Sequence, residues 1–135
     1  MHRARIHRQG GDLTIVTYSR MLDTSLRAAA QLAGEGIEAT VIDLRSLRPI
    51  DWESCADSVA QTHHLLVVEE DSRFAGAGAE IVAGLTERCF YDLDVPPGRV
   101  AGRELPIPYN GTLEAQCIPR PSDVVAAARR LVQSP

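Results

Sequence analysis

The chain has 135 residues, enough for one domain with a substantial core, and 44% of them are hydrophobic. Aromatic residues make up only 4%, so aliphatic side chains must fill that core. Eighteen acidic residues outnumber 14 basic ones, all arginine, and the net charge is −4. This balance, without a run of basic residues, argues against nucleic-acid binding. We also expect no membrane contact, because no apolar run approaches the ~20 residues of a span and the basic N-terminus lacks a signal peptide's apolar region.

The three cysteines are odd in number, widely spaced and without a C-x-x-C motif. Cys55 and Cys89 fall on the apolar faces of helical patterns, whereas Cys117 lies in a proline-rich stretch. Cys55 and Cys89 are therefore expected to be small core residues and not ligands or nucleophiles. Free thiols of this kind favour a reducing compartment, and we expect a cytoplasmic protein.

A strand followed by a helix is predicted in the first quarter of the chain. Leu13–Tyr18 (LTIVTY) is enriched in β-branched residues, as strands are. Ser19 is placed to cap the next helix, and Gly34 and Gly36 to end it. The side chains expected on the buried face of that helix are Leu22, Leu26, Ala29 and Ala33.

The next unit has the same order. Glu38–Leu44 (EATVIDL) is a predicted strand, and the loop 45–50 follows it. Asp51 is expected to cap a second helix. The residues expected to form the buried face of this helix are Trp52, Cys55, Ala56 and Val59.

The central unit runs from Leu65 to Leu85. Leu65–Val68 is a short branched run typical of a strand buried on both faces, and the acidic residues 69–71 are expected to end it. A helix should begin near Gly78. The loop Gly76, Ala77 and Gly78 could bind an anion at the helix N-terminus. The segment lacks the third glycine of G-x-G-x-x-G, however, and its acidic neighbours would repel phosphate. We favour a tight turn that lets the helix pack closely on its strand.

The C-terminal part alternates loops with short elements. Tyr91–Gly98 is a predicted loop with two acids, Asp92 and Asp94, and Arg99–Ala101 a brief strand. Four prolines in Leu105–Pro121 exclude a central strand or a helix and indicate an extended arm that lies on a surface, its own or a partner's. Ser122 is expected to cap a last helix. Its apolar side should comprise Val124, Val125, Ala128, Leu131 and Val132.

Strands alternating with helices through short loops predict an α/β domain with helices on both faces of a sheet. Ala4–Arg8 is either a short edge strand or the end of a linker. We therefore set residues 1–12 apart from a domain at 13–135.

The residues alone reveal no catalytic set. His63 and His64 are adjacent and cannot form an H-x-x-x-H metal pair. Arg45 and Arg48, in one loop after a buried strand, are the best candidates for a polar role, because arginine at such a place can clamp a neighbour's carboxylate. The alternative is a local ion pair with a nearby acid. The three acids considered are Asp43, Asp51 and Glu53.

Three segments together resemble one family. They are VTYSRMLDTSLRAAAQLAGEGIEATVIDLRSLRPID, LLVVEEDSRFAGAGAEIVAGL and LPIPYNGTLEAQCIPRPSDVVAAARRL. The most characteristic part is Val41–Asp51 (VIDLRSLRPID), followed by GAGAEI. They resemble the C-terminal domain of transketolase-like enzymes that depend on thiamine diphosphate. The greatest similarity is to the beta subunit of the decarboxylating component of 2-oxo acid dehydrogenase complexes (pyruvate, branched-chain and acetoin types). The resemblance implies a three-layer α/β/α domain with a mixed, mostly parallel five-stranded sheet.

The resemblance also implies what this domain does. The thiamine diphosphate, the magnesium ion and the catalytic residues of such enzymes belong to other domains, so we expect no catalytic, cofactor-binding or metal-binding residue here and no activity of the isolated chain. The implied role is assembly with an alpha subunit and a second beta subunit, and docking of the dihydrolipoyl acyltransferase. The residues expected at these interfaces are Arg45, Arg48, Asp92, Asp94 and Tyr109.

Two alternatives remain open at this point. One is a free-standing anion- or ligand-binding module that uses the loop Gly76–Gly78, and the other is the equivalent domain of a transketolase or deoxyxylulose-phosphate synthase-like enzyme. Since the family places a pyrimidine-binding domain ahead of this one, we expect either an excised domain or a natural orphan.

Overall fold

Five strands form a single mixed sheet in the computed structural model, which describes residues 3–72, 74, 76–102 and 118–133. Across the sheet the strand order is β1-β3-β2-β4-β5. The edge strand β1 runs antiparallel to β3, and all the other neighbours are parallel. The strands are β1 (Arg5–Arg8), β2 (Leu13–Thr17), β3 (Ala39–Asp43), β4 (Leu65–Ser72) and β5 (Gly98–Gly102). The expected edge strand and the brief last strand are thus both present.

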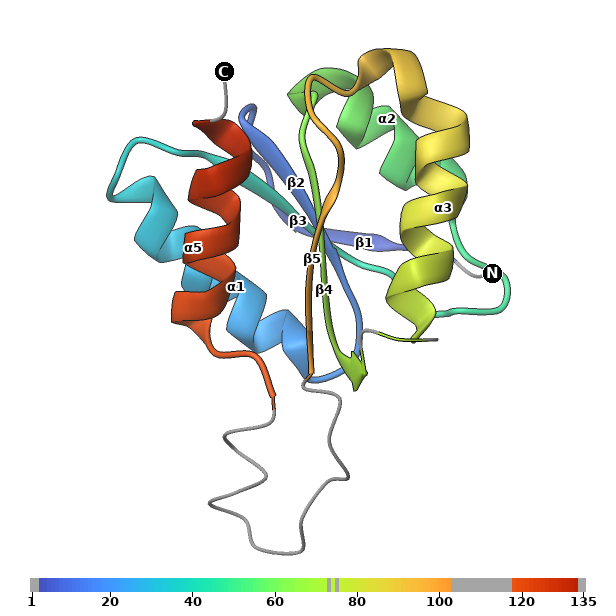
Figure 1. Ribbon diagram of the computed structural model, residues 1–135, viewed down its shortest axis with the longest axis horizontal. Coiled ribbons are helices and arrows are strands. Elements are labelled where there is room, and N and C mark those ends of the chain that lie inside the picture. Colours follow the sequence, from blue (N-terminus) through green and yellow to red (C-terminus); the bar gives the residue numbers. More distant parts are fainter. Residues whose placement is uncertain (1–2, 73, 75, 103–117, 134–135) are drawn as a thin grey trace, which may run out of the picture.

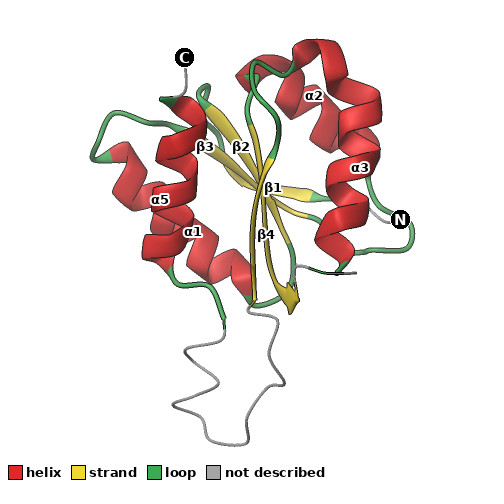
Figure 2. Cartoon of the chain, in the orientation of Figure 1, coloured by secondary structure: helices red, strands yellow, loops and turns green. Residues whose placement is uncertain are grey.

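Helices cover both faces of this sheet and complete three layers (Figures 1 and 2). On one face lie α1 (Met21–Ala33) and α5 (Pro121–Val132), which pack against each other. On the other lie α2 (Trp52–Thr62) and α3 (Ala77–Cys89), followed by the short 3-10 helix η1 (Phe90–Asp92). The predicted three-layer α/β/α class is confirmed. Within the described part of the chain, no helix has the length and apolar character needed to cross a membrane.

Two aliphatic cores separate the three layers. Every residue of β2 is buried, and its side chains alternate between the two cores: Leu13 and Ile15 face α1 and α5, whereas Val16 faces α2 and α3. Cys55 and Cys89 are free thiols in the second core, as expected of small apolar residues. Burial raises the pKa of the Cys55 thiol to about 12, so this sulfur remains protonated at neutral pH.

One of the three predicted helix caps is correct. Asp51 accepts a hydrogen bond from the Ser54 backbone N–H at 3.1 Å and caps α2. Ser19 does not cap α1, because it adopts a left-handed conformation (φ 59°) and the helix begins one residue later, after Arg20. Ser122 does not cap α5 either. Pro121 already occupies the first helical position, for which its fixed φ is suited, and this moves the start of α5 upstream.

The buried face of α1 also differs from the prediction. Leu22 and Leu26 are only partly buried. The fully buried residues are Met21, Ser25, Ala28, Ala29 and Leu32. Because α1 packs against both the sheet and its neighbour α5, small residues are needed where the two helices approach each other, and the buried face turns toward Ala28 and Ala29.

The acidic residues 69–71 do not end the central strand, contrary to the prediction. The strand β4 continues through them to Ser72 and pairs there with Gly102 of β5. It can do so because Glu69, the first of the three acids, is fully buried and has partners inside the fold.

Candidate functional site at the carboxyl edge of the sheet

The Glu69 carboxylate lies at the carboxyl end of β4, where open α/β sheets commonly hold their sites. Its exposed fraction is 0%. One oxygen accepts the Gly78 backbone N–H at 2.9 Å, and the other accepts the Arg99 guanidinium at 3.0 Å. The Tyr18 hydroxyl lies 3.2 Å from the first oxygen. We name this cluster of Glu69, Gly78, Arg99 and Tyr18 the sealed junction.

Gly78 has a specific reason to be glycine. A Cβ atom there would lie 1.7 Å from the Glu69 Oε2 atom, so any larger residue would displace the carboxylate. Gly76 is the N-cap residue of α3 and Ala77 its first residue. The predicted anion-binding loop therefore contacts an anion that the chain itself supplies, and the helix packs closely on its strand, as the favoured interpretation required.

The hydroxyl of Tyr18 links the sealed junction to the next acid, because it also lies 2.8 Å from the Asp71 carboxylate. Burial, the hydrogen bond to Asp71 and the nearby negative charge of Glu69 all raise the pKa of Tyr18 above its usual value. Glu70, between the two acids, is paired with Arg20. Each acid of the stretch 69–71 thus has a partner at the end of β2 or on β5.

The described residues do not fit thiamine diphosphate or its magnesium ion. No three histidine, cysteine, aspartate or glutamate side chains in residues 3–72, 74, 76–102 and 118–133 converge as metal ligands. At the start of α3, where a diphosphate could bind, the Gly78 N–H is bonded to Glu69, and the carboxylates of Glu69 and Asp71 would repel it.

The loop after β3 is different, because its charges face solvent. Arg45 and Arg48 are both exposed, and neither forms an ion pair with a carboxylate of the described residues. The alternative of a local ion pair is therefore wrong. Asp43 accepts the Arg45 backbone N–H at 3.1 Å and contacts His7 at 3.8 Å, and Asp51 accepts the Ala4 N–H at 2.9 Å.

The acids Asp92 and Asp94 lie beyond α3, at the opposite edge of the sheet from Arg45 and Arg48. They flank a groove of about 460 Å³, which we name the Phe90–Pro97 groove. Its lining comprises Thr86, Phe90, Tyr91, Leu93, Asp94, Val95, Pro96 and Pro97. At its rim, Phe90 is 64% exposed and Tyr91 97% exposed, and their rings meet edge to face. Sequence reasoning missed this aromatic pair, although two adjacent aromatics in so aromatic-poor a chain are a signal.

His63 fixes the start of that groove to the end of α2. Its backbone carbonyl accepts the Asp94 N–H at 3.0 Å, and its ring Nδ1 lies 2.8 Å from the Asp92 carbonyl oxygen. Tyr109, the remaining predicted interface residue, lies outside the described residues, as does most of the proline-rich arm and Cys117.

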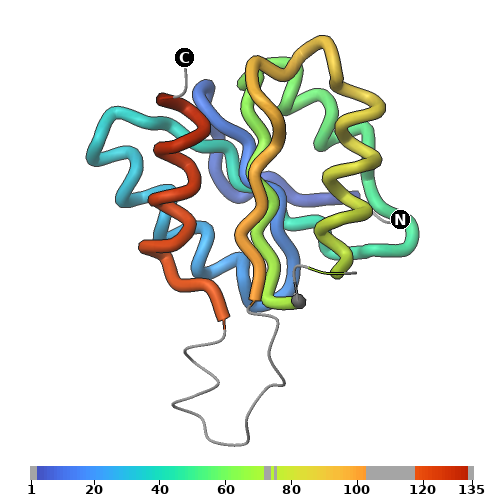
Figure 3. Tube along the Cα trace, viewed as in Figure 1, coloured from blue at the N-terminus to red at the C-terminus, as the bar shows by residue number. Residues whose placement is uncertain are grey.

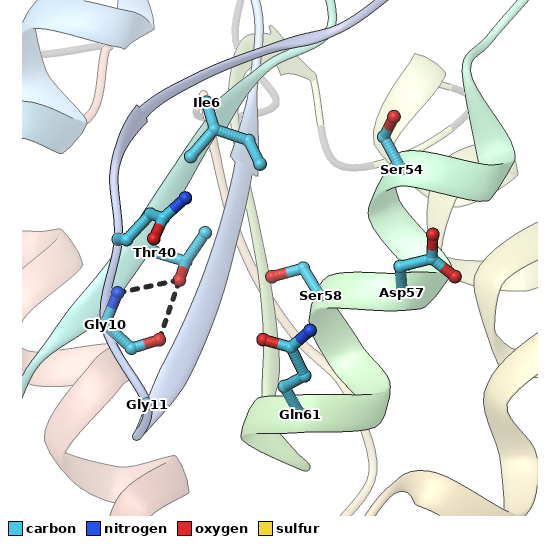
Figure 4. A pocket seen from close by; sticks show the side chains of 9 residues that line it. Ile6, Gly10, Gly11, Thr40, Ser54, Asp57, Ser58 and Gln61 are labelled. Atoms are coloured by element: carbon cyan, nitrogen blue, oxygen red, sulfur yellow. Dashed lines mark hydrogen bonds between the residues drawn. The ribbon is translucent and has the colours of Figure 1, made fainter.

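A second groove, of about 630 Å³, lies between β1 and α2 and was also missed (Figure 4). Ile6, Gly10 and Thr40 form one wall, and Ser54, Asp57, Ser58 and Gln61 of α2 form the other. Thr40 Oγ1 accepts the Gly10 N–H and donates to the Gly10 carbonyl, at 2.9 and 2.7 Å. Ser58 lies 2.7 Å from the buried Thr14 hydroxyl. We name this second cavity the β1–α2 groove.

These features define an α/β/α domain in which the buried Glu69 carboxylate occupies the usual ligand position at the carboxyl ends of the strands. The loop after β3 and the two grooves are accessible to solvent. The family model described as the transketolase C-terminal domain matches residues 2–124, and the chain belongs to that family.

Solved structures support the same assignment. A split-gene transketolase in an inactive beta4 tetramer superposes with a TM-score of 0.79 at 29% identity, covering 97% of this chain and 41% of that one. A transketolase variant from Pichia stipitis shares the fold, with a TM-score of 0.61 at 18% identity over 97% of this chain and 18% of that one.

Curated relatives are more similar in sequence. The mitochondrial pyruvate dehydrogenase E1 component subunit beta of Drosophila melanogaster is 47% identical over 96% of this chain and 36% of its own length. The Caenorhabditis elegans protein of the same name is 49% identical over 95% of this chain and 37% of its own length. The pyruvate dehydrogenase E1 component subunit beta of Porphyra purpurea is 40% identical over 99% of this chain and 40% of its own length. The chain thus spans between a third and two fifths of the length of these relatives.

The expectation of a cytoplasmic protein is contradicted by this comparison. The Drosophila, Caenorhabditis and Arabidopsis relatives are all named as mitochondrial proteins. Free cysteines indicate a reducing environment but do not tell the cytoplasm from an organelle interior, which is why composition misled.

Proposed function

We propose that this chain is the assembly and partner-docking domain of a 2-oxo acid dehydrogenase beta subunit, part of an oxidoreductase that transfers an acyl group to a lipoyl carrier. The observation that carries the proposal is the 47% identity to a pyruvate dehydrogenase beta subunit over 96% of the chain. Pyruvate is accordingly the favoured substrate of the parent enzyme. Thiamine diphosphate and magnesium would be held by other domains of that enzyme, because the described residues here do not fit them.

Two surfaces would serve the two kinds of partner. The loop with Arg45 and Arg48 would contact the alpha subunit or a second beta subunit, since exposed guanidinium groups without intrachain partners can clamp a neighbour's carboxylates. The Phe90–Pro97 groove would receive the subunit-binding domain of the dihydrolipoyl acyltransferase. It offers apolar contact area with Asp94 in its lining and Asp92 beside it, which suits a partly apolar, basic docking module. Tyr109 stays a predicted member of these interfaces.

The alternatives have less support. A free-standing anion-binding module would need the Gly76–Gly78 loop, whose Gly78 N–H is already bonded to Glu69. The equivalent domain of a transketolase is supported by the superposition at 29% identity, against 47% for the dehydrogenase relative. Co-purification separates these alternatives: the dehydrogenase alpha subunit and acyltransferase should co-purify with the chain. Retention of neither would overturn the proposal.

Calorimetry tests whether thiamine diphosphate and magnesium are bound by other domains and not by this one. We expect no saturable heat when thiamine diphosphate and magnesium are titrated into the 135-residue chain. The matched positive control is the same titration into a complete dehydrogenase. Saturable binding by the chain alone at micromolar concentration would place a cofactor site here and contradict the proposal.

A double substitution tests the docking surface. Asp92→Asn with Asp94→Asn should weaken binding of the acyltransferase docking module at low salt, and the difference from the unsubstituted chain should shrink at high salt, because screening shortens the reach of charge from ~10 Å at 0.1 M to ~3 Å at 1 M. The control pair, Asp23→Asn with Glu53→Gln, removes two exposed charges elsewhere and should leave binding unchanged. Equal affinities of the Asp92/Asp94 variant and the unsubstituted chain at low salt would remove this surface from the proposal.

A further inference from the structure

The β1–α2 groove shares no residue with the two surfaces of the proposed function, the loop after β3 and the Phe90–Pro97 groove. It forms because the first strand folds back along β3 at the edge of the sheet, as the trace in Figure 3 shows. Ser58 and Gln61 point from α2 toward the opposite wall, which contains Thr40 (Figure 4). Because Ser58 is only 9% exposed and Thr40 6%, the groove reaches buried hydroxyl groups.

A row of hydroxyl groups leads from the floor of this groove into the core. Thr14 Oγ1 lies 2.7 Å from both Ser58 Oγ and Thr62 Oγ1. Thr62 in turn donates to the His64 carbonyl oxygen at 3.2 Å. Each hydroxyl has a single hydrogen to donate, and a carbonyl oxygen can only accept. The hydrogen of Thr62 is therefore used on the carbonyl, so Thr14 must donate to Thr62, and Ser58 must donate to Thr14.

This order leaves Ser58 Oγ with lone pairs but no hydrogen for the groove. Thr40 is in the same state, because its hydroxyl donates to the Gly10 carbonyl at 2.7 Å. Ser54, farther along α2, donates its hydrogen to the Asp51 carboxylate at 2.7 Å. All the hydroxyl groups of the lining thus present acceptors only, and a ligand that bonds to them must bring its own donors.

The charge and the apolar part of the lining narrow the choice of ligand. Asp57 is the charged residue of the lining, is exposed, and forms no ion pair with a basic group of residues 3–72, 74, 76–102 or 118–133. Its negative charge at the rim favours a cation over an anion. Ile6, which is 43% exposed, offers a surface for an aliphatic chain.

A lysine side chain combines these properties. Its ammonium group has three donors and no acceptor, and it ends a flexible aliphatic stem. The planar fork of arginine suits the paired oxygens of a carboxylate or phosphate, whereas the acceptors here are single oxygens on two walls. The chain contains no lysine, so neither its own residues nor a second copy could supply this side chain.

We infer that the β1–α2 groove binds a lysine side chain of a partner protein. The ammonium donates to Ser58 Oγ, Thr40 Oγ1 and the side-chain oxygen of Gln61, and the stem packs on Ile6. Asp57 attracts the cation to the mouth of the groove. This inference goes beyond the proposed function and does not rest on it, because it uses none of the residues assigned to the two docking surfaces.

The test is an NMR titration of the 15N-labelled chain with Nα-acetyl-lysine N-methylamide, since amide shifts detect weak binding and locate it. We expect saturable shifts at Gly10, Gly11, Ser58 and Gln61, with a Kd of about 1–10 mM for a single side chain. The Nε-acetylated probe keeps the stem but loses the charge, and it should bind at least about ten-fold more weakly. Equal binding of the two probes, or no saturable shift, would overturn the inference. Tighter binding of the arginine analogue, or the same shifts with potassium chloride, would also overturn it.

Substitutions place the lysine probe within the groove. Ser58→Ala should weaken its binding by about three- to ten-fold, as expected for one hydrogen bond to a charged group. Asp57→Asn should weaken it by about two- to five-fold at low salt and less at high salt. The matched control is Glu53→Gln, which removes an exposed acid from the same helix outside the lining and should change the affinity less than about two-fold. Equal losses for Asp57→Asn and Glu53→Gln would contradict a site in this groove.

Urea denaturation tests the order of the hydroxyl groups independently of any ligand. Ser58→Ala leaves every remaining hydrogen of the row with an acceptor, whereas Thr62→Val leaves the Thr14 hydrogen without one. Thr62→Val should therefore lower the urea midpoint further than Ser58→Ala does. The reverse ranking would mean that the hydrogens run the other way and that Ser58 donates into the groove, which would exclude an ammonium there.

Discussion

Two segments at the carboxyl edge of the sheet differ in whether their charged side chains are buried and paired or exposed and unpaired. In the sealed junction at the carboxyl end of β4, the Glu69 carboxylate is fully buried and bonded to Gly78 and Arg99. In the loop after β3, Arg45 and Arg48 are exposed and form no ion pair with a described carboxylate. The sequence favoured a tight turn at Gly76–Gly78 and a polar role for Arg45 and Arg48.

Burial explains the difference. A buried charge left without a partner costs several kcal/mol, so folding requires that each one be satisfied within the chain. An exposed ion pair contributes only about 0–1 kcal/mol, so a chain loses little stability by leaving an exposed arginine unpaired. The sealed junction therefore contributes to architecture, and the loop after β3 remains available for a partner at little cost to stability.

The largest expected effect is that of Glu69→Gln. Glutamine keeps the size of the side chain and an oxygen for the Gly78 N–H, but it removes the buried negative charge that pairs with the Arg99 guanidinium, which is 14% exposed. Loss of one partner of a buried pair typically costs about 3–5 kcal/mol, and we expect the free energy of unfolding in urea to fall by about 3 kcal/mol.

Glu70→Gln is the matched control, since its partner Arg20 lies at the surface. It should cost about 1 kcal/mol or less. Equal losses for the two variants would show that burial does not distinguish these neighbouring acids.

The next effect in size is that of Gly78→Ala. Alanine inside a helix is ordinarily more favourable than glycine by up to about 1 kcal/mol. Here its Cβ would meet Glu69 Oε2 at 1.7 Å, and overpacking typically costs about 1–3 kcal/mol. The double variant Glu69→Ala with Gly78→Ala should lose less than the sum of the single losses, because the carboxylate that causes the clash is gone.

Gly11→Ala controls for the loss of glycine as such, because a Cβ there meets no atom within 4 Å. Its free energy of unfolding should change by a few tenths of a kcal/mol. Additive losses in the double variant at Gly78 would contradict the role of glycine in the sealed junction.

Alkaline pH probes the same junction with a smaller effect. The folded-state pKa of Tyr18 is raised above the ordinary value of about 10, mainly by burial and by the hydrogen bond to Asp71. The protonated hydroxyl therefore contributes its full stability below pH ~10, and this contribution is lost as the pH rises above that value. No lysine titrates in this range, although the buried Cys55 thiol contributes with the same sign.

The measurement is urea denaturation from about pH 8 to 11, bracketing the ordinary tyrosine pKa. Tyr18→Phe should lose stability less steeply above pH ~10 than the unsubstituted chain does. Tyr91→Phe, whose ring is 97% exposed, should keep the original slope. Identical slopes for the unsubstituted chain and Tyr18→Phe would show that the tyrosine is not held protonated by its neighbours.

What the sequence could predict was local. The strand Leu13–Tyr18 and the cap at Asp51 follow from residues next to one another, and both are present. The end of the central strand was misplaced because the burial of Glu69 depends on Arg99 and Tyr18, which lie 30 and 51 positions away. The family resemblance supplied the sheet class, which alternation alone left open.

The candidate site was less predictable for the same reason. Arg45 and Arg48 could be chosen from a single loop, whereas the β1–α2 groove exists only because β1 folds back along β3. The Phe90–Pro97 groove depends on a contact between His63 and Asp94, which no local pattern encodes. Side chains gathered from distant segments are what periodicity and spacing cannot reveal.

The smallest effect on folding should be that of the double substitution Arg45→Ala with Arg48→Ala, and this near-absence of effect is itself the prediction. Neither guanidinium has an acidic partner in the described chain to lose, so the free energy of unfolding should change by about 0–1 kcal/mol, as for exposed charges generally. Retention of the alpha subunit in co-purification should fall, because charged groups at an interface affect association more than folding. Arg27→Ala on α1 should alter neither quantity by more than a few tenths of a kcal/mol. A loss of several kcal/mol in the isolated chain would mean that the loop after β3 is as structural as the sealed junction.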